Sequence, residues 1–281
     1  MRRASLLLML ALAVAVTACG GGDQSASTGA GTTSTSAQQA VLDAAARGAE
    51  LESGRISFTA IIDAGPVSGT FTGEGAFNGK KARVLLDMSD FTNGQISGTT
   101  QAVFDDLVMY MRFPAQISNA FGLPAGKEWI RFDLAELGKQ QGIDFGALFN
   151  QFSGSDPSRA LEFLRAAQND FRRVGDEEVR GIETTHYQGT VDLERLAETA
   201  PADARESYRR LLELSAQARI PVDVWIDGDG RTRRIRYEQE MRDGSSMKLT
   251  QDYYDFGADV NVEPPSANEV ADFADLLGNP A

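Results

Sequence analysis

Residues 56–77, ISFTAIIDAGPVSGTFTGEGAF, carry the clearest structural signal in the chain, because apolar and polar side chains alternate on both sides of a central turn. Apolar residues occupy the even positions from Ile56 to Ile62. Phe71 and Phe77 frame two glycines at odd positions. A period of two places the apolar side chains on one face of a strand. The stretch predicts two antiparallel strands with one apolar face and one polar face.

The same alternation continues in both directions along the chain. It recurs over residues 83–88 and 102–113, and again over 222–226, 235–237 and 247–256, with Gly- and Asp-containing turns between the runs. Residues 171–191 have the pattern of a hairpin that turns near Asp176-Glu177. Short links between successive strands indicate an antiparallel meander.

Helical spacing separates these strand groups. Apolar residues recur every three or four positions over 38–52, 134–152, 157–167, 193–218 and 267–277, and Pro201 interrupts the fourth of these segments. Glycines inside the strands permit strong curvature of the sheet. We therefore predict an α+β fold: a curved antiparallel sheet, a half-barrel, with helices covering its concave face.

Residues 10–21, LALAVAVTACGG, complete an apolar run that follows Arg2 and Arg3 and contains the one cysteine of the chain, Cys19. A basic start, an apolar centre and small residues at the cleavage zone are the plan of a secretory signal peptide. Thr17 and Ala18 resemble a bacterial lipobox, in which the following cysteine is acylated, for instance with palmitate. A cleaved signal in which Cys19 has no role stays open as an alternative.

Composition changes sharply after this run. Residues 20–39 hold no large apolar side chain and are mostly Gly, Ser, Thr and Ala, a composition typical of a flexible tether. We expect a signal peptide over 1–18, a tether over 19–37 that begins at lipidated Cys19, and a single folded domain over 38–281. This organisation predicts a lipid-anchored protein on the extracytoplasmic face of the cell membrane.

The charge of the chain narrows the range of partners. The formal net charge is −13, and removal of Arg2 and Arg3 with the signal peptide would change it to −15. Such a surface repels phosphate backbones and anionic lipid head groups. We therefore expect no nucleic-acid partner, and contact with the membrane only through the acyl chains on Cys19.

Residue patterns that serve catalysis are sparse. The single histidine, His186, lies in a predicted strand without a G-x-S-x-G serine motif. Asp227-Gly-Asp229 begins like a calcium loop, but Arg231 stands where an oxygen ligand is needed. One histidine and one cysteine exclude a Cys/His zinc cluster. We expect no enzyme activity, no catalytic residue, no metal and no cofactor, and an envelope hydrolase stays an alternative without a positive signal.

Large flexible side chains gather on the predicted apolar faces. Methionine fills irregular space and suits adaptable binding surfaces, so these positions can line an apolar pocket between sheet and helices. An equally good interpretation is an ordinary packed core. The candidate lining residues are Phe58, Ile62, Phe71, Leu86, Met88, Met109, Met111, Phe149, Leu164 and Leu212.

Several short motifs resemble the LppX/LprG family of actinobacterial lipoproteins, whose half-barrel is similar to the lipoprotein carrier LolA. They are Thr17-Ala18-Cys19, the tether, the segment from Tyr187 to Leu193, Val222-Asp-Val-Trp225-Ile-Asp227, and Tyr253-Tyr-Asp-Phe-Gly257 before Pro264-Pro265. The resemblance implies a LolA-like domain that binds or transports lipid or lipoglycan in a hydrophobic cavity at the cell envelope. It also implies no metal or cofactor, and an envelope transport partner.

Two function classes remain in competition. The first is a membrane-anchored carrier, for which each buried CH₂ of an acyl chain contributes about 0.8 kcal/mol. The alternative is an envelope protein-interaction or sensor module of the same fold without lipid cargo. The interrupted helix at Pro201 departs from the family pattern and leaves the size of the ligand open.

Overall fold

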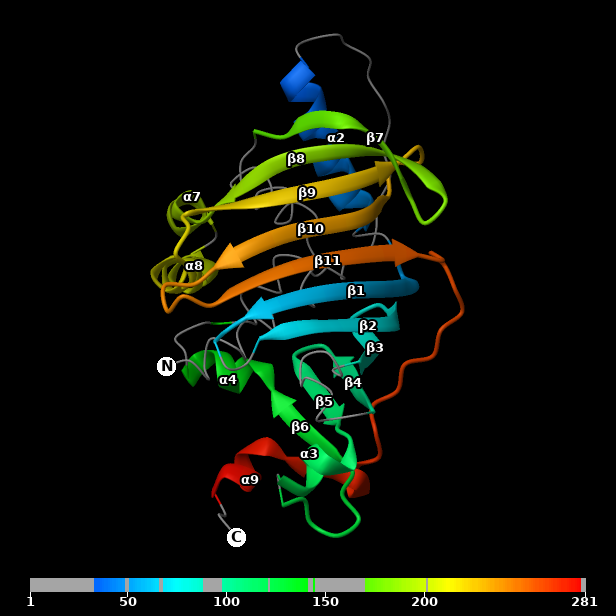
Figure 1. Cartoon of the computed structure of the whole chain (residues 1–281), viewed down its shortest axis with the longest axis vertical. Helices are drawn as coiled ribbons and strands as arrows, with labels where there is room; N and C mark the ends of the chain where they lie inside the picture. Colours follow the sequence, from blue (N-terminus) through cyan, green and yellow to red (C-terminus); the bar gives the residue numbers. More distant parts are fainter. Residues whose placement is uncertain are drawn as a thin grey trace.

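Twelve strands form one open sheet in the computed structural model (Figure 1), which describes residues 33–48, 51–65, 68–87, 98–120, 122–140, 144, 170–200 and 202–278. The strand order is β12-β6-β5-β4-β3-β2-β1-β11-β10-β9-β8-β7, and all neighbours are antiparallel except β12 and β6. The strands are β1 (Ser53–Asp63), β2 (Gly69–Asn78), β3 (Lys81–Asp87), β4 (Thr99–Asp105), β5 (Val108–Arg112), β6 (Trp129–Asp133), β7 (Arg172–Val179), β8 (Ile182–Asp192), β9 (Arg219–Asp227), β10 (Thr232–Glu240), β11 (Ser246–Tyr254) and β12 (Val270–Asp272).

The sheet consists of two meanders joined at its centre. Strands β1 to β6 follow one another in space as in sequence, and so do β7 to β11. Strand β1 pairs with β11 from Arg55–Tyr254 to Asp63–Ser246. The antiparallel meander expected from the short turns is confirmed. The pairing of the first strand with β11 makes both meanders one continuous surface.

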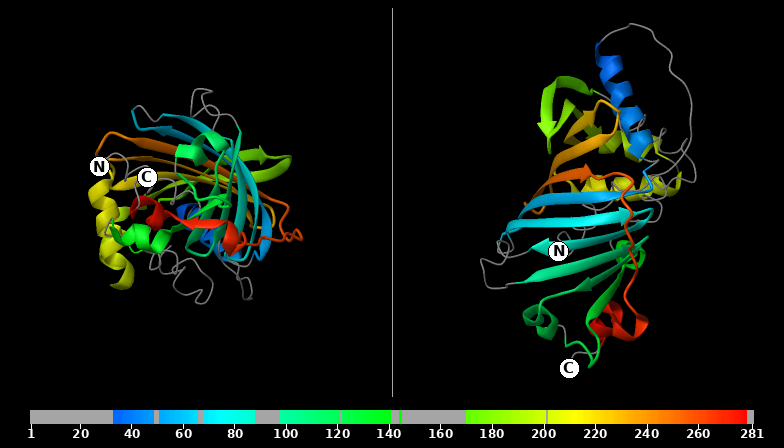
Figure 2. Two further views of the ribbon diagram at one scale, coloured as in Figure 1. Left: turned by 90° about the horizontal axis from the view of Figure 1, so that it is seen from below. Right: turned by 90° about the vertical axis from the view of Figure 1, so that its right-hand side faces the viewer.

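Most of the described helices lie on one side of this sheet, at its ends and edges (Figures 1 and 2). Helix α2 contacts β7, β9 and β10; α7 contacts α8 and β9; α4 contacts β5 and β6; and α9 contacts β6 and β12. The bounds are α2 (Thr33–Gly48), α3 (Ala115–Ala120), α4 (Leu134–Gln140), α7 (Leu193–Thr199), α8 (Ala202–Leu214), the 3₁₀ turn η1 (Ala267–Glu269) and α9 (Phe273–Gly278). The fold is therefore the expected α+β half-barrel with helices on one face.

The alternation in the sequence produces two different faces. Ile56, Ala60 and Ile62 of β1 are at most 2% exposed, whereas Ile61 between them is 47% exposed. The strand pairing places buried side chains of neighbouring strands on the same face, since Ala60 lies opposite Phe71 on one side and opposite Leu249 on the other. We call the surface that carries these apolar side chains and contacts the helices the inner face, and the opposite surface the outer face.

Two inner-face glycines make room for aromatic rings. A Cβ on Gly73 would lie 2.5 Å from the ring of Phe58, its cross-strand neighbour. A Cβ on Gly54 would lie 2.9 Å from the ring of Phe77, which is also its cross-strand neighbour. Each glycine therefore lets a phenylalanine lie flat over the neighbouring strand.

Three boundaries differ from the sequence-based expectation. The hairpin of β7 and β8 turns at Arg180-Gly181, where both residues have positive φ, and not near Asp176-Glu177, which lies within β7. Helix α2 begins at Thr33, so the last residues of the predicted tether are helical. The C-terminal segment expected as one helix contains η1, β12 and α9, because β12 pairs in parallel with β6.

Of the remaining expected segments, one is confirmed by the structure and the others lie outside the described residues. The break at Pro201 separates α7 from α8, and Asp192 caps α7 by accepting a 3.0 Å hydrogen bond from the Arg195 amide. The helical segments expected over 145–152 and 157–167 lie outside the described residues, as does the whole N-terminal region to residue 32, with Cys19.

Candidate ligand-binding face

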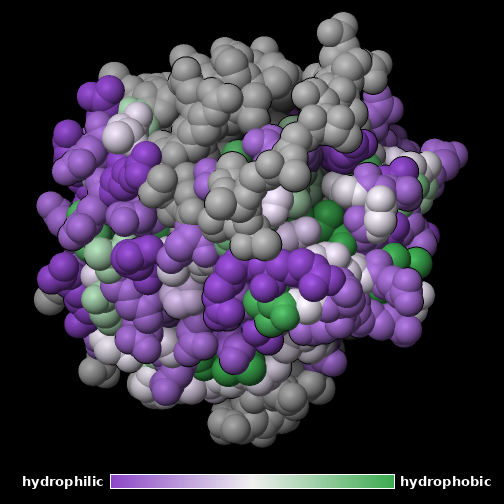
Figure 3. All heavy atoms as spheres, turned by 90° about the horizontal axis from the view of Figure 1, so that it is seen from above, coloured by the Kyte–Doolittle hydropathy of each residue, from purple (hydrophilic) through white to green (hydrophobic). Residues whose placement is uncertain are grey.

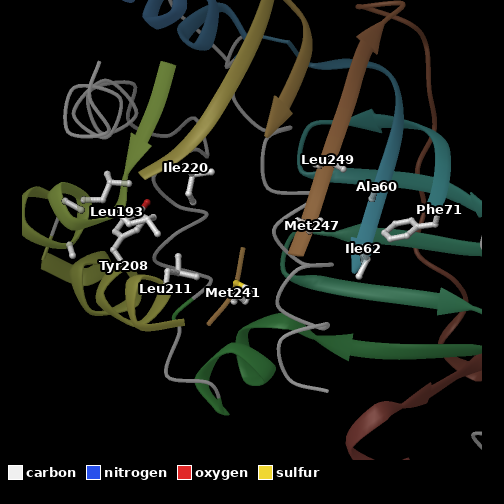
Figure 4. Close-up of a cluster of buried hydrophobic side chains, with 13 residues drawn as sticks. Ala60, Ile62, Phe71, Leu193, Tyr208, Leu211, Ile220, Met241, Met247 and Leu249 are labelled. Atoms are coloured by element: carbon white, nitrogen blue, oxygen red, sulfur yellow. The ribbon is translucent and has the colours of Figure 1, made fainter. Parts of the chain in front are cut away.

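Two apolar clusters occupy most of the inner face. The first joins the centre of the sheet to α7 and α8, and Figure 4 draws its buried members, including Ile62, Phe71 and Met247. The second lies over the other meander and includes Leu86, Met109 and Met111. We call these the first and the second cluster. Together they form an apolar surface that runs across the sheet.

Most of the predicted lining residues meet on this face. Ile62 and Phe71 belong to the first cluster, and Leu212 of α8 packs against it. Leu86, Met109 and Met111 belong to the second cluster, each at most 7% exposed. The remaining candidates Met88, Phe149 and Leu164 lie outside the described residues. The structure thus brings the described candidates together, although the same burial also suits a packed core.

Phe58 connects the two clusters. Its side chain is partly buried and packs against both of them. Its ring makes an edge-to-face contact with Phe71, with 6.0 Å between the ring centroids. Its cross-strand neighbours are Gly73 on β2 and Gln251 on β11. Phe58 is therefore the junction of the apolar surface.

Three polar atoms at this junction have no hydrogen-bond partner. They are the hydroxyls of Tyr237 and Tyr253 and the side-chain oxygen of Gln251, which is 2% exposed. The one further unpaired buried side-chain atom among the described residues belongs to Gln217, after α8. Each buried polar group without a partner lowers the stability of the folded protein by about 1–3 kcal/mol. The three groups therefore lie where a bound ligand could satisfy them.

Both phenols are neutral at physiological pH, as an ordinary tyrosine is, and burial raises their pKa further. Burial raises the pKa of Tyr237, and burial together with the nearby Tyr237 raises the pKa of Tyr253. Each hydroxyl is therefore a hydrogen-bond donor over the whole physiological pH range.

The outer face is polar and highly connected where the inner face is apolar. Arg234 donates two hydrogen bonds to Asp252, of 2.6 and 2.8 Å. Arg236 donates a 3.0 Å hydrogen bond to Asp223, which is 7% exposed. The indole of Trp225 donates a 2.9 Å hydrogen bond to Glu177, and this bond is the main reason that the pKa of Glu177 is lowered. These pairs hold β7 to β11 together.

His186 is part of this outer network. Its ring stacks on Trp225 with 4.2 Å between the ring centroids. Its Nδ1 lies 3.0 Å from Glu177 and its Nε2 lies 2.7 Å from Asp223. Because carboxylate oxygens occupy both ring nitrogens, neither is available to activate a serine. His186 is a packed structural residue in this arrangement.

A groove of about 520 Å³ also lies on the outer face. Hydroxyls and charged side chains from β1, β2, β3, β4, β10 and β11 line most of it, together with exposed Leu85. Figure 3 shows that the described surface seen from above is likewise mostly hydrophilic. The groove is thus a second surface that could hold a ligand, with a chemistry opposite to that of the inner face.

The residues weighed as a calcium loop form a hairpin turn. Asp227 accepts hydrogen bonds from the amides of Asp229 and Arg231, of 3.0 and 2.9 Å, and from Arg233, at 2.6 Å. Its carboxylate is therefore fully used within the turn. Within the described ranges, no group of three His, Cys, Asp or Glu residues is arranged to hold a metal ion. None of the helices described here is both long enough and apolar enough to cross a membrane.

Tyr237, Gln251 and Tyr253 were not identified as site residues from the sequence. Gln251 stands in phase with Met247, Leu249 and Tyr253, so it points to the apolar face. A glutamine at an apolar position of an alternating strand is a detectable signal. Its lack of a partner depends on neighbours far apart in sequence and becomes visible only in the structure.

Comparison with known proteins supports the resemblance seen in the sequence. The family model described as LppX_LprAFG lipoprotein matches residues 133–262, from the end of β6 to just beyond β11. The expected resemblance to the LppX/LprG lipoproteins is thereby confirmed for this part of the chain.

Individual relatives match only part of this chain, at moderate sequence identity. An uncharacterised 31.2 kDa protein of Streptomyces griseus is 35% identical over 158 residues, 54% of this chain and 50% of the relative. The lipoarabinomannan carrier protein LprG of Mycolicibacterium hassiacum is 27% identical over 112 residues, 40% of this chain and 43% of LprG. The chain thus spans about half the length of the curated relatives it matches. The crystal structure of LppX from Mycobacterium tuberculosis aligns with a TM-score of 0.48 at 15% identity, covering 82% of this chain and 99% of LppX.

Proposed function

We propose that this chain, which belongs over residues 133–262 to the LppX_LprAFG lipoprotein family, binds lipid or lipoglycan at its inner face and carries it at the cell envelope. The observation that carries the proposal is the apolar surface formed by the two clusters and joined by Phe58. The relative named as a lipoarabinomannan carrier supports the same ligand class.

Binding would follow from burial of the acyl chains. Each CH₂ that leaves water contributes about 0.8 kcal/mol, so a chain of ordinary length supplies useful affinity without specific polar contacts. Methionines such as Met109, Met111 and Met247 have three rotatable side-chain bonds and can repack around chains of different shape. The described residues supply no metal site, and the mechanism needs none.

Membership in a lipoprotein family implies a membrane-anchored protein of the cell envelope. We propose that Cys19 carries the anchor, at the extracytoplasmic face, and that the following residues act as the tether. Two acyl chains hold a protein stably at a bilayer, whereas one holds it only marginally. The anchored domain could then receive a ligand from the membrane and pass it to an envelope transport partner.

The outer groove favours a second candidate function. Its hydroxyls and paired charges suit a polar protein surface better than an acyl chain. Under this alternative, the domain is an interaction or sensor module, and the inner face is an ordinary core.

Quantification of co-purifying lipid separates the two candidates. The full-length chain is produced in an actinobacterial host, and lipid per mole of protein is measured by organic extraction and mass spectrometry. Leu212→Trp adds bulk beside the first cluster from a partly buried position. Leu85→Trp is the matched control, because Leu85 is 48% exposed and lines the outer groove.

The carrier proposal predicts bound lipid in the wild type, a several-fold loss in Leu212→Trp, and no loss in Leu85→Trp. Wild-type protein without lipid contradicts the carrier. A loss of bound lipid only in Leu85→Trp would mean that the lipid binds in the outer groove. A charged residue at Met109 would be a poorer test, because this side chain is 6% exposed and a buried charge would unfold the domain.

A further inference from the structure

The unpaired atoms of Tyr237, Gln251 and Tyr253 lie on two adjacent strands. Gln251 and Tyr253 are two residues apart on β11, so both point to the inner face. Tyr237 on β10 lies opposite Leu249, one inner-face position before Gln251. We call these three side chains the polar trio. Both residues on β11 are less than 10% exposed.

The polar trio lies where a ligand on the inner face would have to pass. Tyr237 packs against the first cluster and Tyr253 belongs to the second. Gln251 lies opposite Phe58, the junction of the two clusters. An acyl chain that extends over both clusters would therefore cross the trio, and its polar end or linkage could stop there.

The trio offers two donors and one acceptor, all uncharged. The hydroxyls of Tyr237 and Tyr253 can each donate a hydrogen bond, and the side-chain oxygen of Gln251 can accept one. A carbonyl oxygen is the complement of the two donors, and a hydroxyl on the glycerol or sugar part of the same lipid is the complement of the Gln251 oxygen. A carboxylate fits poorly, because burial of a charge opposite neutral groups is costly. Arg233, the next inner-face cation on β10, already pairs with Asp227.

We propose that the polar trio recognises the uncharged acyl-ester group of a bound lipid, with the carbonyl accepting from Tyr237 and Tyr253 and a neighbouring glycerol or sugar hydroxyl donating to Gln251. This inference rests on the proposed lipid-binding function and deepens it. Two sources can supply an acyl ester, a glycerolipid or an acylated lipoglycan, and both present the same carbonyl chemistry. The trio would select against free fatty acids and against chains that carry no carbonyl.

Photolabelling with matched probes tests the inference. Membranes that contain the full-length chain receive monoacylglycerol or the corresponding alkyl glycerol ether, each with a diazirine in a chain of equal length. A third arm uses the fatty acid with the same diazirine. Labelled protein is quantified by mass spectrometry for the wild type, Tyr237→Phe/Tyr253→Phe, and the control Tyr187→Phe, which changes a partly buried inner-face tyrosine that packs near α2.

The wild type should label several-fold more strongly with the ester than with the ether or the fatty acid. A hydrogen bond contributes about two- to tenfold in affinity, so the double variant should label equally with ester and ether, while Tyr187→Phe behaves as wild type. Labelling by the ether should not change in the double variant, which excludes unfolding as the cause. Competition with unlabelled diacylglycerol or with acylated lipoglycan then distinguishes the two sources.

The possible failures are distinct. An ester-to-ether ratio that stays the same in the double variant overturns the role of the trio and leaves the carrier function intact. Preferential labelling of the wild type by the fatty acid overturns the expected selectivity. Absence of labelling by every probe contradicts the carrier function itself, and the inference falls with it.

Discussion

Replacement of Tyr253 by phenylalanine should stabilise the unliganded protein. The hydroxyl of Tyr253 is buried and has no hydrogen-bond partner. A hydroxyl in this state costs about 1–3 kcal/mol relative to its hydrated form in the unfolded chain. Phenylalanine keeps the ring in the second cluster, and the void left by one oxygen costs only a few tenths of a kcal/mol. We expect a net gain of about 1 kcal/mol.

Thermal unfolding of the full-length chain, stripped of lipid, measures this gain. A stabilisation of 1 kcal/mol raises the Tm of a chain of this size by about 2–4 °C. Tyr187→Phe is the control and should change stability by no more than about 0.5 kcal/mol. A Tyr253→Phe variant whose free energy of unfolding falls by about 1 kcal/mol or more would contradict this expectation, because a loss of that size means that the hydroxyl has a partner within the folded protein.

Three further substitutions test other parts of the structure. Gly75→Ala should cost about 3 kcal/mol in chemical denaturation, because its Cβ would lie 2.2 Å from a backbone carbonyl of β3. Asp227→Ala should cost about 3 kcal/mol in the same assay, because it leaves Arg233 largely buried and unpaired. Trp225→Phe removes the indole donor, so the pKa of Glu177 measured by NMR titration should rise toward its ordinary value of 4.5. Since this pKa is lowered in the folded protein, the associated stability is present above the ordinary pKa and is lost as pH falls through the folded value.

Each of these substitutions has a control or an opposing outcome. Asp229→Ala removes an exposed partner of Arg231 at the same hairpin and should cost less than about 0.5 kcal/mol. If Asp229→Ala lost as much stability as Asp227→Ala, the stabilisation would come from the whole turn and not from the buried pair of Arg233 and Asp227. Gly175→Ala is a strand control, since its Cβ would meet no atom within 4 Å and its φ lies outside the left-handed region. An unchanged pKa of Glu177 in Trp225→Phe would show that the indole bond has no effect on that carboxyl.

The local part of the fold follows from the sequence, and the long-range part does not. Alternation around Ile56 and Phe71 predicts the strands and the face that each side chain occupies, since these depend on neighbours within a few residues. The pairing of β1 with β11 joins segments about 190 residues apart, and short turn signals carry no information about it. The parallel pairing of β12 with β6 was missed for the same reason.

The candidate site divides in the same way. Periodicity placed Ile62, Phe71 and Met109 on one apolar face, and all three are buried there. The glycine at 73 was interpreted as a source of curvature, whereas its close contact with the Phe58 ring adds a packing role that depends on a neighbouring strand. The polar trio was not predicted, because an atom can be recognised as unpaired only when all its neighbours in space are known.

Mapping the position of a bound acyl chain shows whether the inner face holds the lipid. A diazirine-bearing acyl lipid is crosslinked to the full-length chain in its membrane, and the labelled residues are identified by peptide mass spectrometry. Lipid binding at the inner face predicts labels on residues of both clusters, with Ile62, Phe71 and Met111 among them. Labels confined to the outer groove around Thr59 and Thr250, or no label at all, would contradict it.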